Sequence, residues 1–382
     1  MLVERRQQVN LTGDTDTVSS SETDHAGLPL TIDEYLRKKL MPVEGVIPHL
    51  PGIDMHGNTI PAGAVGGDVF EYINFQQRYN IDARIAQAEW LANEVLVPLA
   101  KGKKARSGVD DHIQWMSSQP GYMDEDGVQF RKAKRSEQLR IVQNLRELYT
   151  TAGVLLVDAQ GHGIIAAKIA STIHDTLQAF MLSELDRVGT ITPRLFEQLN
   201  LRLAQSATAR NALGRSMDAS SREIATMLYG EIRPNGQFRF LNFGHPPPLV
   251  FSAKYKRFMK IGRDQMAQFL ALGLEIPEDH PDRNKYVSIK LRKRRMDSSD
   301  ISMITLMGRG DIIFLYTDGV YDGSDEQERS RIEAIIGEHK QKAAKDICNA
   351  VLDYALKRDG RLRQEGHSDE IDDKTVFIIK RT

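Results

Sequence analysis

Leu155–Ala170 reads LLVDAQGHGIIAAKIA and contains the feature that decides the fold. An apolar run ends at Asp158, the chain turns through Gly161 and Gly163, and an amphipathic stretch begins. A short apolar run bounded by a turn indicates a buried strand, and the spacing that follows indicates a helix. A carboxylate at the end of a buried strand is costly unless it is paired, hydrogen-bonded or bound to a cation. The sequence therefore raises the question of what Asp158 binds.

Three further aspartates stand at the edges of strand-like apolar runs. They are Asp68 in VGGDVF, Asp318 in FLYTDGV and Asp372 in EIDDKTVFII. Each one alone is explained by turn chemistry, because aspartate beside glycine commonly follows a strand. Carboxylates gathered at one sheet edge would repel one another, and a divalent cation would relieve that repulsion. Oxygen ligands, in a chain with one cysteine and no HExxH pair, favour Mg²⁺ or Mn²⁺ over Zn²⁺.

The order of the segments indicates an α+β fold with mainly antiparallel sheets, because strand clusters and helix pairs do not alternate regularly. Strand-like runs lie at 52–75, 152–163, 224–251, 311–323 and 372–382, and helix-like stretches lie at 82–100, 131–149, 163–185, 192–207 and 331–357. Pro234-Asn235-Gly236 is expected to form the turn of a hairpin. Residues 1–30 indicate a disordered tail and 31–42 a short helix.

Composition narrows the class of protein. The 382 residues carry a formal net charge of −1, so no overall basic field points to nucleic acid, and the basic run 290–295 is expected to be a solvated loop. No stretch approaches the roughly 20 apolar residues of a membrane span. The only cysteine, Cys348, has no basic neighbour to activate it and is expected to be a core thiol. We expect a protein of the cytoplasm, with no membrane and no nucleic-acid partner.

The motifs together resemble those of a known family. VGGDVFEY, LLVDAQGHGIIAA, LNFGHPPPLVF, GDIIFLYTDGVYD and DDKTVFII occur in this order. They are similar to the motifs of PPM-type metal-dependent serine/threonine phosphatases, in the SpoIIE-like bacterial branch that includes the RsbU-like regulators. The resemblance implies an αββα sandwich: two mainly antiparallel sheets flanked by helices. It implies one phosphatase domain over residues 31–382.

The resemblance also implies roles for individual residues. The implied metal ligands are Asp68, Asp158 as the bridging carboxylate, the backbone carbonyl of Ala159, Asp318 and Asp372. Asp373 is expected to support the site by hydrogen bonding rather than by direct ligation. His162 is a candidate general acid beside the catalytic Asp158; the alternative is a loop histidine that orients the turn. His245, between a strand and three prolines, is expected to be structural.

The implied activity is hydrolysis of phosphoserine or phosphothreonine on a regulatory partner protein, expected to be a STAS-domain anti-anti-sigma factor. The implied cofactors are two Mn²⁺ or Mg²⁺ ions, with a third as an option, and a metal-bridged hydroxide would attack phosphorus without a covalent phosphoenzyme. Two alternatives stay open. One is a non-catalytic or activator-dependent partner-binding module of the same fold, and the other is a hydrolase of small phosphate esters or nucleotides.

The sequence departs from the family pattern between about residues 76 and 150, where relatives have a short hairpin turn. Two helix-like stretches in this insertion predict a helical unit. Long insertions in compact domains are usually functional or disordered. Two interpretations remain: the helices pack on their own domain, or they form a regulatory or dimerising pair beside the site, which would make the protein a homodimer.

Overall fold

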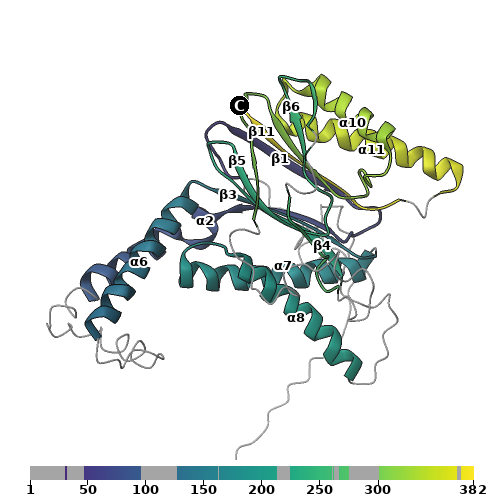
Figure 1. Cartoon of the computed structure of the whole chain (residues 1–382). Helices are drawn as coiled ribbons and strands as arrows, with labels where there is room; N and C mark the ends of the chain where they lie inside the picture. The colour runs from purple at the N-terminus through teal and green to yellow at the C-terminus, as the bar shows by residue number, and fades with distance from the viewer. Residues whose placement is uncertain are drawn as a thin grey trace, which may run out of the picture.

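The structure is a computed structural model that describes residues 31, 47–95, 127–161, 163–212, 224–259, 261, 266–274, 301–367 and 371–382. Two β-sheets lie face to face, and helices cover both outer faces (Figure 1). The expected α+β sandwich of two mainly antiparallel sheets is confirmed. Within the described ranges, no helix has both the length and the apolar character needed to cross a membrane. The predicted tail 1–30 and most of the predicted helix 31–42 lie outside these ranges.

The first sheet has the strand order β1-β11-β10-β6-β7, and all its neighbours are antiparallel. Its strands are β1 (Ile53–Ile60), β6 (Leu249–Ser252), β7 (Arg257–Phe258), β10 (Ile312–Tyr316) and β11 (Lys374–Arg381). Burial alternates residue by residue along β1, as expected for an edge strand with one covered face. The C-terminal strand β11 lies between β1 and β10, so the last residues of the chain complete the sheet.

The second sheet has the order β2-β3-β4-β5-β8, and β9 also pairs with β5. Its strands are β2 (Asp68–Asn74), β3 (Ala152–Ala159), β4 (Ala225–Ile232), β5 (Gln237–Phe243), β8 (Gln268–Phe269) and β9 (Ser302–Thr305). Only the pairing of β5 with the two-residue strand β8 is parallel among these strands. The predicted hairpin turn joins β4 to β5, where Gly236 donates its N–H to the carbonyl of Arg233 at 2.9 Å.

Two helices cover each outer face of the sandwich (Figure 1). The second sheet packs on α7 (Gly163–Val188) and α8 (Pro193–Ala212), and the first on α10 (Glu326–His339) and α11 (Ala344–Glu365). The region expected as one helix over 331–357 is therefore two helices. At the start of α11, the carboxylate of Asp54 on β1, which is distant in sequence, accepts the N–H of Ala344 at 2.7 Å.

The insertion contains α2 (Phe75–Tyr79), α3 (Ile81–Trp90), a short π-helix (Leu91–Val95) and α6 (Gly127–Tyr149). In Figure 1, α6 extends away from the sandwich beside the earlier helices of the insertion. The inner faces of these helices join the core of the second sheet through Phe75, Ile81, Ile141 and Leu145. Packing on their own domain is therefore part of their role, while the regulatory interpretation stays a prediction.

The alternation of side chains along β2 and β3 decides which residues face the other sheet. Phe70 and Leu156 belong to the core between the two sheets, whereas Val69 and Val157 belong to the core against α7. Because successive side chains of a strand point to opposite faces, Asp68 and Asp158 lie on the inner face, at the edge of the space between the sheets.

Candidate metal centre

Asp68 and Asp158 are cross-strand neighbours. Asp68 begins β2, Asp158 is the penultimate residue of β3, and the antiparallel register places the two directly opposite each other. Directly opposed residues of an antiparallel pair lie on the same face, with Cβ atoms about 5 Å apart. Like charges in this position repel, so the two carboxylates are a destabilising pair unless a cation lies between them.

Asp68 is held by hydroxyl groups of the opposite sheet. Its Oδ2 accepts hydrogen bonds from the hydroxyls of Thr317 at 2.6 Å and Thr375 at 2.8 Å. The Thr375 hydroxyl also lies 2.8 Å from the Thr59 hydroxyl. Thr59 lies in β1, Thr375 in β11 and Thr317 directly after β10, so the hydrogen bonds to Asp68 cross from one sheet to the other. They leave Asp68 Oδ1 as the oxygen best placed to bind a cation.

Asp318 and Asp372 come from the first sheet. Asp318 follows β10, Asp372 lies two residues before β11, and both are exposed. The two loops are in direct contact: a Cβ atom at Gly319 would lie 2.0 Å from the Asp373 carbonyl oxygen. Only glycine fits at this position, which explains the Asp-Gly pair after β10 in physical terms.

Asp373 supports the site through backbone hydrogen bonds, as the sequence predicted. Its Oδ1 accepts the N–H of Ala62 at 2.7 Å, and its Oδ2 accepts the N–H of Gly67 at 2.6 Å. The side chain is 3% exposed and is used in holding the turn between β1 and β2. Asp373 therefore helps to place Asp68 at the start of β2, and its role as a support of the site rather than a ligand stays a prediction.

The carboxylates perturb one another. Burial and, next, the charge of Asp158 raise the pKa of Asp68 well above its usual value. Burial and the charges of Asp318 and Asp372 raise the pKa of Asp158 to about 7. Burial and Asp372 likewise raise the pKa of Asp318. Each carboxylate would release its proton more easily beside a cation, so the electrostatics of the cluster favour cation binding.

The predicted carbonyl ligand lies in the same place. A Cβ atom at Gly67 would lie 2.8 Å from the Ala159 carbonyl oxygen, so glycine at this position leaves that oxygen uncovered by a side chain. Gly67 in turn accepts the Ala159 N–H at 3.3 Å. His162 lies outside the described residues, and its role as a general acid stays a prediction.

The donor set fits hard divalent ions. The side chains are all carboxylates, and with the Ala159 carbonyl they offer only oxygen, which Mg²⁺ and Mn²⁺ prefer. In the described part of the chain, no three His, Cys, Asp or Glu side chains are drawn closely enough together to hold a metal ion by themselves.

Other residues singled out from the sequence have structural roles. His245 is 1% exposed, its Nδ1 lies 2.8 Å from the Thr226 hydroxyl, and burial lowers its pKa to about 3. Cys348 is buried, and burial raises the pKa of its thiol to about 12. Both predictions of a structural role agree with these positions. Glu71 points away from the carboxylates and pairs with Arg78 of α2 and His174 of α7.

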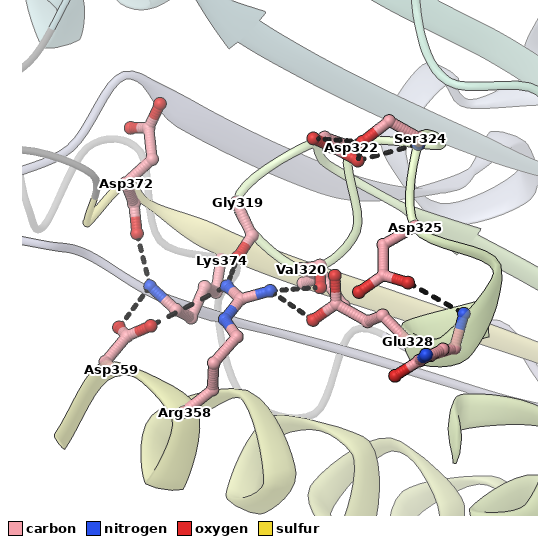
Figure 2. Close-up of polar contacts among 11 residues, drawn as sticks. Gly319, Val320, Asp322, Ser324, Asp325, Glu328, Arg358, Asp359, Asp372 and Lys374 are labelled. Carbon is pink, nitrogen blue, oxygen red and sulfur yellow. Dashed lines mark hydrogen bonds and ion pairs between the residues drawn. The ribbon is translucent and has the colours of Figure 1, made fainter. Parts of the chain in front are cut away.

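Sequence reasoning missed the residues that hold the carboxylates in place. Thr317 and Thr375 stand directly beside predicted ligand motifs, in TDG and DDKT, but hydroxyl residues next to turns are too common to be informative. Arg358 and Asp359 on α11 also reach the loops of Asp318 and Asp372 (Figure 2). Their motif contains no signal, because the contact depends on how α11 packs across the first sheet.

Comparison with known proteins assigns the chain to a family. The model of the SpoIIE family, described as stage II sporulation protein E, matches residues 150–288 and 304–382, more than half of the chain. The chain belongs to the SpoIIE family, and the resemblance noted from its motifs is confirmed. No curated protein matches it in sequence.

Solved structures with similarity to the chain include phosphatase domains. The RsbU and RsbW domains of Rv1364c from Mycobacterium tuberculosis are 16% identical, with 88% of this chain and 61% of that chain covered and a TM-score of 0.45. The PP2C domain of SpoIIE from Bacillus subtilis with part of its regulatory domain is 16% identical, with 60% and 54% covered and a TM-score of 0.39. The SiaA PP2C domain of Pseudomonas aeruginosa is 12% identical, with 86% and 85% covered and a TM-score of 0.41. This chain spans less than two thirds of the first two structures.

Proposed function

We propose that this protein is a Mn²⁺- or Mg²⁺-dependent phosphatase that removes phosphate from serine or threonine of a regulatory partner protein. The observation that carries the proposal is the opposed pair of Asp68, where β2 begins, and Asp158, where β3 ends. Asp318 and Asp372 are near enough to raise the pKa of Asp158 by their charge. A binding module would gain nothing from keeping four mutually repelling carboxylates at one edge.

In this proposal each residue has a separate task. Asp68, Asp158 and the Ala159 carbonyl would hold the ions from the second sheet, with Asp158 as the shared carboxylate, and Asp318 and Asp372 would hold them from the first sheet. When bound, the ions supply Lewis-acid activation of water and offset the charge of the phosphoryl group. The Thr317 and Thr375 hydroxyls orient Asp68, because both donate to the same carboxylate oxygen.

His162 is proposed as the general acid that protonates the departing serine or threonine oxygen. Replacement by glutamine should slow turnover of phosphoserine, whose alkoxide leaving group needs a proton, much more than turnover of an aryl phosphate, whose leaving group does not. Equal losses on the two substrates would favour the alternative, a histidine that only orients the loop.

The function is tested by phosphate release from a phosphoserine STAS-domain protein, measured with EDTA and with Mn²⁺. Wild type should release phosphate only with the metal, and Asp158→Asn and Asp318→Asn should both lose at least 100-fold in rate. The matched control is Asp353→Asn, which removes an exposed carboxylate on α11 and should keep the wild-type rate.

The same assay separates the alternatives. Retained binding of the phosphoprotein without release, with any metal, would identify a partner-binding module. Faster turnover of nucleotides or small phosphate esters than of the phosphoprotein would identify a hydrolase of another substrate class.

We further propose that residues 31–382 act as one domain in the cytoplasm. Deleting residues 80–148 tests whether the insertion supports a homodimer: unchanged oligomeric state and activity would refute that role.

A further inference from the structure

One turn near the end of α11 reaches the two loops that carry Asp318 and Asp372. Arg358 and Asp359 are consecutive on this helix, which covers the outer face of the first sheet. Figure 2 shows Arg358 directed to the loop after β10 and Asp359 directed to Lys374 at the start of β11. One helix therefore contacts both loops that carry the predicted ligands of the first sheet.

Arg358 holds the loop of Asp318. Its Nη2 donates to the Gly319 carbonyl at 2.5 Å, and its Nη1 donates to the Val320 carbonyl at 3.0 Å and pairs with Glu328 of α10. These two carbonyls belong to the residues directly after Asp318. A planar guanidinium can satisfy both at once, whereas a lysine ammonium is a single point of charge on a flexible stem.

Lys374 holds the loop of Asp372. Its Nζ donates to the Asp372 carbonyl at 2.5 Å and pairs with the Asp359 carboxylate at 2.5 Å. The Lys374 and Asp359 side chains are 2% and 4% exposed, so this is a buried ion pair. The next residue, Thr375, points to the opposite face of the strand and donates to Asp68. Two consecutive residues at the start of β11 therefore help to position two predicted ligands: Lys374 positions Asp372, and Thr375 positions Asp68.

Buried ion pairs are poor stabilisers, since the cost of removing both charges from water is comparable to their attraction. A hydrophobic pair would cover the first sheet equally well, and yet it could not bind the carbonyls of Gly319 and Asp372. Both cationic side chains end on backbone oxygens of the acidic loops. Their common target indicates a role in placing the loops rather than in packing the helix.

We propose that Arg358 and the Asp359–Lys374 pair are positioning residues that fix Asp318 relative to Asp372 and so set the affinity of the first-sheet side of the centre for its metal ion. The inference rests on the proposed function, because it concerns the same metal centre. Hydrogen-bonding partners behind ligand groups typically change metal affinity or activity by 10- to 100-fold when they are removed.

The test is isothermal titration of the full-length protein with Mn²⁺, without substrate, comparing wild type with Arg358→Lys. The lysine keeps the charge but lacks the planar fork with which two separate nitrogens donate to the Gly319 and Val320 carbonyls, so we expect a dissociation constant roughly 10-fold higher. At saturating Mn²⁺ the rate of phosphate release should recover. Asp359→Asn, which leaves Lys374 to hold Asp372 alone, is a second variant and should show the same shift.

Two control variants separate positioning from general damage. Arg361→Lys changes an exposed arginine of the same helix and should bind Mn²⁺ as wild type does. Val351→Ala removes buried volume from α11 but none of the hydrogen-bonding groups of Arg358, Asp359 or Lys374, so it should lower the melting temperature and leave the Mn²⁺ affinity unchanged. Any variant that fails to fold is recognised by circular dichroism before titration, and the other positioning variant then decides.

The outcomes are distinguishable. If wild type binds Mn²⁺ and both positioning variants bind it equally well, the inference is overturned and the proposed function stands. A shift no larger than that of Val351→Ala also overturns it, because loss of stability would then be the whole effect. If wild type binds neither Mn²⁺ nor Mg²⁺, the proposed function itself fails.

Discussion

Asp158→Asn is predicted to stabilise the metal-free protein while it abolishes activity. The carboxyl of Asp158 begins from an ordinary pKa of 3.8 and is raised to about 7 by burial and by the charges of Asp318 and Asp372. At about 1.36 kcal/mol for each pKa unit, keeping this group ionised in the folded state costs about 4 kcal/mol. Asparagine has nearly the same shape and no charge, so the variant avoids that cost.

The sign of the pH dependence follows from linkage. A carboxyl whose folded pKa is raised contributes stability that is fully present below pH 3.8 and is lost as pH rises through about 7. Wild type therefore loses stability with rising pH at this group, and the variant does not. Between pH 5 and pH 8, the advantage of Asp158→Asn in the free energy of unfolding should grow by roughly 2 to 3 kcal/mol.

Urea unfolding in EDTA, followed by circular dichroism at pH 5 and pH 8, measures the effect. Asp353→Asn, an exposed carboxylate of α11, is the control and should show no such pH dependence. Adding Mn²⁺ at 100 times its dissociation constant should stabilise wild type by about 2.7 kcal/mol and leave Asp158→Asn almost unchanged. A variant advantage that is equal at the two pH values, or a variant less stable than wild type at pH 8, would refute this account of the cluster.

Two further predictions concern residues beside the centre. Burial alone would raise the pKa of Glu71, but hydrogen bonds from His174 and Arg78 outweigh it and lower that pKa. Burial alone would lower the pKa of His174, but its hydrogen bond to Glu71 outweighs it and raises that pKa. The stability that ionised Glu71 contributes to the folded state is lost as pH falls through its lowered pKa. The stability that protonated His174 contributes is lost as pH rises through its raised pKa. Glu71→Gln should therefore cost most between about pH 5 and 6.5, on the order of 2 to 4 kcal/mol in urea unfolding; an equal cost at pH 8.5 would show that His174 contributes nothing. Gly319→Ala would place a Cβ 2.0 Å from the Asp373 carbonyl oxygen and should lower stability by about 1 to 3 kcal/mol and abolish metal-dependent phosphate release; wild-type release would contradict the close approach of the two loops.

Local pattern was sufficient to predict most strands and helices, whereas the two-sheet sandwich was implied by the family resemblance. The apolar run before Asp158 is β3, the stretch after it is α7, and the polar turn at Gly236 joins β4 to β5. Period and turn chemistry are properties of a few neighbouring residues, so they are visible in a sequence. The α10–α11 break was missed, and the Asp54 carboxylate that accepts a hydrogen bond at the start of α11 is distant in sequence.

The carboxylates were found for the same reason, and their supports were not. Aspartate at a strand end has a cost that sequence alone reveals, whereas Thr317 and Arg358 gain their roles only when two sheets and a helix pack together. The order of the motifs identified the family, but no spacing in the sequence states that Asp68 accepts hydroxyl donors from the opposite sheet. Cross-sheet contacts join residues as many as 307 positions apart, as Thr375 and Asp68 are.

The distribution of the ligands over both sheets has a consequence for how the centre works. Asp68 and Asp158 belong to the second sheet, and Asp318 and Asp372 belong to loops of the first. An ion bound by all four would join the sheets at one edge, where the threonine hydroxyls already connect Asp68 to the first sheet. Any change that moves one sheet against the other would alter the distances among the carboxylates as well as the packing of the core between the sheets. Metal affinity should therefore respond to how the two sheets pack, and a partner that binds across the two sheets could change it without touching a ligand.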